Sequence, residues 1–449
     1  DEKAWELANA VVVIAMIATV IVSILCFIFA GPLMRNVIAP DLPANVMADA
    51  IQTMRILLLS PVLIGLGIAA KGMLEAQDMF TLPALAPVVY NMAIIVAIIV
   101  LAPSMGIEGV SLGAIVGASC HVGIQIPGLI RSGARFAPTL HPFAVDGVGE
   151  VLRLLGPRVI GQAAFQINFI WVTSLANRAG EGRVAAMNYG WQMLMLPHGL
   201  IALSISTVIF PRMARLYEQR KMGELRHVYT QALAPLLFLT LPASIGLYEF
   251  RGPIIAAIYQ HGAFDAYDTM LVASALQFLA LGLVFYGLVE VATRIFYAMK
   301  DTVTPVVAGL IIIGVNMAIG LLLLDSLGHV GLAIGLSLST GLEAIILMAI
   351  LRRRIGGLES TFAPWFARLL IATAAMALMG EYVSNLLGKA LSSPETGQIM
   401  ELALTGYAIA LVGATFLITA WLLRMPEITT SLRRGRSLAR KLPVIGQFA

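Results

Sequence analysis

Polar side chains and a proline interrupt an apolar stretch of the sequence, MNYGWQMLMLPHGL at residues 187–200. Asn188 and Gln192 are spaced i, i+4, so a helix places them on one face. Pro197 leaves a backbone carbonyl one turn earlier without its helical partner. Such groups are stable at membrane depth beside a water-filled cavity or inside packed protein. The stretch therefore predicts either a cavity wall that contacts a polar ligand or a kink packed against neighbouring helices.

A second polar stripe lies in the sequence LLGPRVIGQAAFQINF. Arg158, Gln162 and Gln166 are spaced i, i+4, i+8 and share one helix face. A guanidinium group binds phosphate through two parallel hydrogen bonds, although an Arg near a helix end can also extend to the membrane surface. We predict one substrate-binding cavity that these three side chains line together with Asn188 and Gln192.

Four further titratable residues fall within apolar segments. Glu290 and Arg294 are spaced i, i+4, and they form either a neutralised structural pair or a gating contact between two halves of the protein. His121 and Glu343 occupy one position of an internal repeat that is described below. They are a candidate titratable pair for proton coupling, and hydrogen-bonded packing is the alternative interpretation.

Several motifs of catalytic and metal-binding proteins are missing from the sequence. It contains no G-x-x-x-x-G-K-[ST] phosphate loop and no H-E-x-x-H zinc motif. Cys26 and Cys120 both lie in apolar runs and are interpreted as packing residues. We therefore expect no enzyme activity, no metal or other cofactor and no nucleic-acid partner. The remaining interpretation is a process coupled to the membrane potential or to a monovalent cation.

The composition excludes a soluble protein of this size. Of 449 residues, 59% are hydrophobic and only 12% are charged, which is too few charges to cover a soluble surface. The apolar runs are long and lack the period of two that a membrane barrel requires. The sequence therefore predicts an all-α polytopic membrane protein. We expect twelve spans at 8–33, 54–74, 83–102, 107–130, 150–177, 184–210, 227–249, 270–298, 304–325, 329–351, 363–386 and 400–424.

The distribution of Lys and Arg predicts the orientation of these spans. Of the 29 basic residues, 19 lie in connectors on the side of the N-terminus and 5 in connectors on the opposite side. Basic residues favour the cytoplasmic side, so we expect both termini in the cytoplasm. Residues 426–449 mix apolar and basic side chains, which indicates a tail on the anionic inner leaflet or a solvated basic tail.

Part of the first half of the sequence recurs in the second half. With an offset of 222 residues, Gly106, Gly109 and Gly113 match Gly328, Gly331 and Gly335. The repeat pairs the first four spans with the seventh to tenth, which gives a parallel two-lobe bundle. We expect an N-lobe remnant of four spans (1–148), a C-lobe of six (149–358), two C-terminal spans (359–425) and the tail. The repeat also predicts a helix pair before residue 1.

Four sequence motifs resemble the MurJ (MviN) family of the MOP superfamily, which also contains the MATE exporters. They are GMLEAQDMFTLPALAPVVYN at 72–91, the run from Pro197-x-Gly199 to Thr207-x-x-x-Pro211, HGAFDAYDT at 261–269 and FYAMKDTVTP at 296–305. The resemblance implies fourteen helices, arranged as two six-helix lobes in parallel pseudo-symmetry followed by two C-terminal helices. This number agrees with the helix pair that the repeat predicts before residue 1.

The resemblance also implies a function. Members of the family move lipid II, the undecaprenyl-diphosphate-linked precursor of peptidoglycan, across the bacterial cytoplasmic membrane. The two lobes rock around a cationic cavity, and the implied partners are the lipid-linked glycan, membrane lipids and the cell-wall synthesis machinery. The implied location is the bacterial inner membrane.

This sequence departs from the family pattern within the predicted cavity. Gln192, Trp191 and Met195 stand where the family commonly has Arg, Asp and Glu. Glu290 replaces a Lys, and Arg158 stands where a small residue is usual. The departures leave two alternatives to lipid II transport, which are a MATE-like or polysaccharide-repeat flippase and a non-transporting membrane scaffold.

Overall fold

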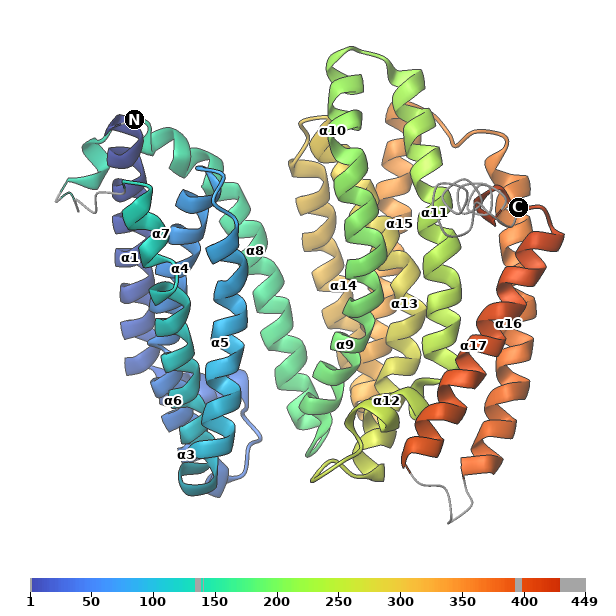
Figure 1. Ribbon diagram of the computed structural model, residues 1–449, viewed down its shortest axis with the longest axis horizontal. Coiled ribbons are helices and arrows are strands. Elements are labelled where there is room, and N and C mark those ends of the chain that lie inside the picture. The colour runs from blue at the N-terminus through green and yellow to red at the C-terminus, as the bar shows by residue number, and fades with distance from the viewer. Residues whose placement is uncertain (1, 134–138, 140, 392–397, 429–449) are drawn as a thin grey trace, which may run out of the picture. The chain divides into compact units, whose positions relative to one another are not determined.

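All regular structure in the described part of the chain is helical (Figure 1). The computed structural model describes residues 2–133, 139, 141–391 and 398–428. Within these residues, 11 helical spans are long and apolar enough to cross a membrane, and they coincide with all the predicted spans except the fifth. Helices suit these apolar segments because they satisfy their backbone hydrogen bonds internally. The predicted fold class is confirmed.

The fifth predicted span corresponds to α8 (Val148–Arg178), an unbroken helix of 31 residues. A helix of this length extends about 46 Å at 1.5 Å per residue, which exceeds the roughly 30 Å of membrane hydrocarbon. Some side chains of α8 lie outside the described part of the structure. The helix itself follows the predicted segment, 150–177, closely at both ends.

The chain forms two compact units, and the first comprises Asp1–Ser174. Its elements are α1 (Glu2–Ile28), α2 (Ala30–Leu33), the π-helix η1 (Met34–Ile38), α3 (Ala44–Leu57), α4 (Ser60–Glu75), α5 (Thr81–Val100), α6 (Ala102–Gly123), α7 (Ile126–Arg131), the short 3₁₀-helix η2 (Pro142–Ala144) and most of α8. Helices α5 and α6 form a tight hairpin. A Cβ on Gly117 would lie 2.8 Å from the Tyr90 carbonyl oxygen, so glycine permits this close approach.

The second unit comprises Leu175–Ala449 and is built around one central helix. Its elements are α9 (Arg183–His198), the π-helix η3 (Gly199–Leu203), α10 (Ser204–Glu218), α11 (Met222–Glu249), α12 (Arg251–Tyr259), α13 (Ala266–Ala298), α14 (Val303–Leu327), α15 (His329–Ile355), α16 (Phe362–Leu391) and α17 (Gln398–Leu422). Helix α13 packs against α9, α11 and α15. It begins with a capping box in which Asp265 and Asp268 each bond the other's backbone N–H.

The internal repeat is visible in the local geometry of both units. Asp78 and Lys300, 222 residues apart, end equivalent helices in the left-handed conformation, with φ of 60° and 61°. A Cβ on Gly109 would lie 2.9 Å from a carbonyl oxygen of the preceding segment, and one on Gly331 would lie 2.7 Å from the matching oxygen. The glycines of the sequence repeat therefore permit the same close helix contact twice.

The two C-terminal helices pack on each other and on α11. Leu369, Val412 and Phe416 belong to the buried cluster that joins them. The division between the two units falls within α8, after Ser174. The predicted lobe boundaries and the predicted helix pair before residue 1 stay predictions. Most of the predicted basic tail, 426–449, lies outside the described residues.

Candidate functional site

Helix α9 changes its winding directly after Pro197. The α-helix ends at His198 and continues as the π-helix η3 before α10 begins at Ser204. A proline cannot donate to the preceding turn, and the wider π-turn accommodates the lost hydrogen bond. Single π-turns inside α-helices are frequent at functional sites. The break that the sequence predicts is thus a π-turn in an otherwise continuous helical segment.

An aromatic and polar cluster lies between this segment and α13. The ring of Tyr286 on α13 meets Trp191 edge-on with a centroid distance of 5.4 Å. It meets the ring of His198 at 6.3 Å, also close to perpendicular. The Nδ1 atom of His198 is buried and has no hydrogen-bond partner within the described structure. Trp191 and His198 therefore pack onto α13.

The predicted pair of Glu290 and Arg294 continues this cluster along α13. Arg294 donates from Nε to Oε1 of Glu290 at 3.0 Å, and the hydroxyl of Ser206 on α10 donates to the same oxygen at 3.1 Å. The side chains of Glu290 and Arg294 are 24% and 33% exposed, so the pair is partly desolvated. These contacts join α13 to α10 inside the second unit. A gating role of the pair stays a prediction.

Asn188 and Gln192 lie on the face of α9 that is turned away from the buried core. Helix α9 buries its opposite face, including Met193 and Leu194, against the core of the second unit. Gln192 is exposed and Asn188 is half-buried. The pair therefore presents amide groups on a face of α9 that remains accessible. This exposure is compatible with the predicted cavity wall, which stays a prediction.

The polar stripe of α8 is also accessible. Gln162 and Gln166 are both exposed on the first unit. Arg158 lies in α8, but its side chain is outside the described part of the structure. Two of the three side chains predicted for this stripe are thus not buried by the helix packing of the first unit.

The two candidate titratable residues meet different neighbours. His121 on α6 packs against Gly67 of α4, where a Cβ would overlap its ring, and its Nδ1 is buried without a partner in the described structure. Glu343 on α15 places Oε1 near Gly309 of α14, 3.7 Å from where a Cβ would lie. The residues share a repeat position but face different helices of their own units. Proton coupling through this pair stays a prediction.

The contacts that Tyr286 and Ser206 make in this cluster were not predicted from the sequence. Tyr286 precedes Glu290 by one helical turn, so the i, i+4, i+8 series with Arg294 is the signal that could have identified it. Ser206 carries no comparable sequence signal. No group of three or more His, Cys, Asp or Glu within the described ranges could hold a metal ion. The site is therefore one of hydrogen bonds, aromatic contacts and one ion pair.

The sequence matches a known protein family over most of its length. The sequence model of the family described as "Lipid II flippase MurJ" matches residues 1–395. A lipid II flippase MurJ of Burkholderia cenocepacia is 28% identical over 337 residues, which cover 74% of this chain and 65% of that protein. A probable lipid II flippase MurJ of Rhizobium tropici is 29% identical over 429 residues, covering 92% of this chain and 78% of the relative.

Solved structures show the same fold. A lipid II flippase MurJ in an inward closed conformation superposes with a TM-score of 0.73 at 22% identity, covering 93% of this chain and 84% of that one. An inward-facing MATE multidrug transporter of the MOP superfamily gives a TM-score of 0.69 at 19% identity, covering 78% and 80% of the two chains. The sequence match, which spans most of the chain, distinguishes between these two families. The chain belongs to the MurJ family of lipid II flippases.

Proposed function

We propose that this protein moves lipid II, a polyprenyl-diphosphate-linked peptidoglycan precursor, across the bacterial cytoplasmic membrane. The observation that carries the proposal is the family match over residues 1–395. The protein is a multi-pass membrane protein, and the Lys and Arg distribution supports a topology with both termini in the cytoplasm. The polyprenyl lipid and the cell-wall synthesis machinery are its proposed partners.

The accessible amide groups supply the proposed headgroup contacts. Gln162 and Gln166 on α8 and Asn188 and Gln192 on α9 each offer donors and an acceptor to sugar hydroxyls and phosphate oxygens. Gln192 is uncharged where the family commonly has Arg, so it would bind a diphosphate more weakly than a guanidinium does. Arg158 is the basic residue of the stripe and the proposed ligand of the diphosphate.

The polar cluster of α13 supports the accessible face of α9 from behind. Trp191 and His198 contact Tyr286, while Ser206 binds Glu290 further along α13. The π-turn between them is the position at which this segment could bend with the least loss of regular hydrogen bonds. We propose that transport couples to the membrane potential or a monovalent cation, with no enzymatic step.

Growth complementation tests this function. Cells depleted of their own lipid II flippase would receive the full gene that encodes this chain, either unchanged or with Arg158→Ala. We expect the unchanged gene to restore growth and Arg158→Ala to fail at equal membrane abundance. Arg153→Ala, a substitution of an exposed basic residue earlier in α8, is the matched control and should restore growth.

Two results would contradict parts of the proposal. Full rescue by Arg158→Ala would remove Arg158 from the binding site and leave the function standing. Failure of the unchanged gene, despite normal insertion, would contradict lipid II transport. The structural likeness to a MATE transporter favours export of another amphipathic substrate as the second candidate, and drug-efflux assays on the same strains would detect it.

A further inference from the structure

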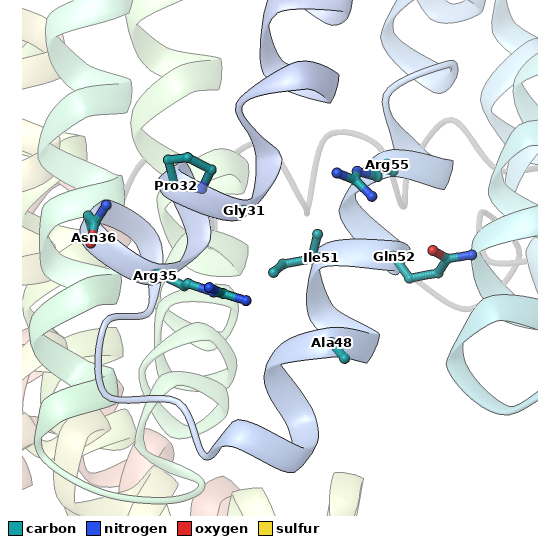
Figure 2. Close-up of a pocket in the computed structure, with 8 residues that line it drawn as sticks. All are labelled: Gly31, Pro32, Arg35, Asn36, Ala48, Ile51, Gln52 and Arg55. Atoms are coloured by element: carbon teal, nitrogen blue, oxygen red, sulfur yellow. The ribbon is translucent and has the colours of Figure 1, made fainter.

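A polar pocket lies in the first unit, at the end of α1 remote from its N-terminus. It occupies about 640 Å³ between the segment formed by α2 and η1 and the facing helix α3. Arg35 and Asn36 come from η1, whereas Ile51, Gln52 and Arg55 come from α3 (Figure 2). None of the residues proposed for lipid II binding contributes to this pocket.

Two guanidinium groups point into the pocket. Figure 2 shows Arg35 extending from η1 toward α3 and Arg55 extending back from α3 toward the segment of Gly31. The Arg55 guanidinium lies over the ring of Phe27, 5.3 Å from its centroid, and this contact holds it near the pocket. Arg35 lies within the π-helical turn η1.

Within the described residues, no carboxylate neutralises the positive charge of this pocket. No carboxylate within the described ranges forms an ion pair with Arg35 or Arg55, and no acidic residue lines the pocket. Two like charges in one pocket repel each other at a cost that an anion between them removes. Guanidinium groups bind phosphate oxygens through paired hydrogen bonds, so phosphate is the anion that the pair suits best.

The surface next to the pocket suits hydrocarbon chains. The flank of α1 that leads to the pocket exposes a continuous apolar strip at helical spacing, formed by Ile17, Ile21, Ile24, Leu25 and Ile28. Each of these side chains is about half exposed. An apolar strip that ends in a cationic pocket is the arrangement that an anionic lipid requires, with its chains along α1 and its phosphate at the arginines.

The equivalent region of the second unit lacks the two arginines of the pocket. Around this pocket the repeat offset is 221 for the first segment, where Gly31 and Pro32 match Gly252 and Pro253, and 222 for the facing helix. Tyr248 thus stands at the position of Phe27 and Gln277 at that of Arg55, and Gln277 donates to the Tyr248 hydroxyl at 3.3 Å. The one guanidinium there, that of Arg251, lies over the Tyr248 ring and donates to the Tyr248 carbonyl oxygen. Ala256 replaces Arg35. The repeat thus provides a matched site without a free pair of arginines.

We propose that this pocket binds the phosphate of an anionic membrane lipid, with Arg35 and Arg55 as its ligands and the apolar strip of α1 along its chains. The distribution of Lys and Arg predicts that this end of α1 faces the extracytoplasmic leaflet. The site is separate from the proposed headgroup path and does not depend on lipid II transport. A glycerophospholipid and a polyprenyl phosphate share the chemistry that it recognises.

Native mass spectrometry of the purified full chain in detergent tests this site. Phosphatidylglycerol would be titrated against the unchanged chain, the double variant Arg35→Gln/Arg55→Gln and the control Arg251→Gln. We expect the double variant to weaken the lipid affinity about tenfold or more, since two charge-assisted contacts are lost. Arg251→Gln should change it less than about twofold, because Arg251 is already engaged with the ring and the carbonyl oxygen of Tyr248. Phosphatidylcholine should bind the unchanged chain about tenfold more weakly than phosphatidylglycerol.

Competition distinguishes the sources of the phosphate. A polyprenyl phosphate that displaces phosphatidylglycerol from the unchanged chain would support the site and add a second lipid source. Displacement by inorganic phosphate at equal concentration would show a free-anion site and contradict the lipid assignment. Equal affinity in the double variant and the unchanged chain, with unchanged thermal unfolding, would overturn the proposal. An equal loss in Arg251→Gln would also overturn it, since a general charge effect would then explain the binding.

Discussion

Gly106 and Gly328 lie 222 residues apart and have nearly the same backbone conformation, with φ of 58° and 57° and ψ of −137° and −136°. This region of φ and ψ is accessible almost only to glycine. Gly106 forms a sharp kink near the start of α6, and Gly328 forms the connection between α14 and α15, so the same sharp turn occurs once in each unit. The two halves of the chain therefore repeat a backbone geometry as well as a sequence pattern.

Substitution of either glycine should destabilise its own unit. Gly106→Ala and Gly328→Ala each force an L-residue into this conformation, at a cost of about 1–3 kcal/mol in the free energy of unfolding. No atom would contact a Cβ at Gly106, so the cost there is conformational. Denaturant unfolding in mixed micelles measures it. Gly413→Ala on α17 is the control and should be neutral or stabilising, because its Cβ would meet open space inside a helix. Equal effects at all three positions would contradict this explanation.

The Glu290–Arg294 ion pair should contribute a small but measurable coupling free energy to the stability of the fold. Arg294→Met leaves a partly buried carboxylate with, among the described residues, the Ser206 hydroxyl as its donor, whereas Glu290→Gln keeps its shape and loses its charge. Because both side chains are about one-quarter to one-third exposed, solvent screening limits the coupling to about 0.5–1 kcal/mol. A double-mutant cycle on unfolding free energies measures this value. Additive single effects would show that the pair contributes nothing to stability.

Asp301, in the connector between α13 and α14, should make stability depend on acid pH. Burial acts to raise its pKa, but hydrogen bonds from the Thr304 hydroxyl and backbone N–H and the Arg354 guanidinium outweigh burial and lower the pKa below its ordinary value. A carboxyl group with a lowered folded-state pKa stabilises the fold above its unfolded pKa, and this contribution is lost as pH falls through the folded pKa.

The expected window for Asp301 therefore lies below about pH 4. Unfolding of the unchanged chain should become easier between about pH 4 and pH 2, and Asp301→Asn should remove part of that slope. Arg354→Gln should reduce the slope as well, because it removes one of the groups that lower the pKa. Asp325→Asn serves as the control carboxyl substitution. An unchanged slope in Asp301→Asn would contradict this assignment.

A buried histidine should anchor the start of α9. Arg183 donates to Nδ1 of His329 at 3.0 Å, and since Arg has no acceptor, Nε2 carries the proton and donates to the Leu271 carbonyl at 3.0 Å. His329→Leu removes both contacts and should cost about 1–3 kcal/mol in unfolding free energy. Ser274, whose hydroxyl also lies 3.1 Å from Nε2, offers a milder test as Ser274→Ala. An unchanged unfolding free energy in His329→Leu would show that packing alone holds the start of α9.

Much of the fold followed from patterns of apolar residues, whereas the site depended on contacts between distant segments. Span positions were predictable because membrane thickness fixes helix length, and the repeat was predictable from glycine spacing. The contact of Trp191 and His198 with Tyr286 was not, because helix periodicity does not reveal which helices become neighbours. Arg35 and Arg55 were separate basic residues in the sequence until the turn through η1 brought them to one pocket.

The direct measurement of the central claim is the amount of lipid II on the outer leaflet of cells that depend on this protein. Radiolabelled lipid II would be exposed to a lipid II-cleaving enzyme added outside cells depleted of their own flippase. We predict that expression of the full gene restores cleavage of lipid II. Continued protection of lipid II, in cells where the protein is inserted at normal abundance, would contradict it.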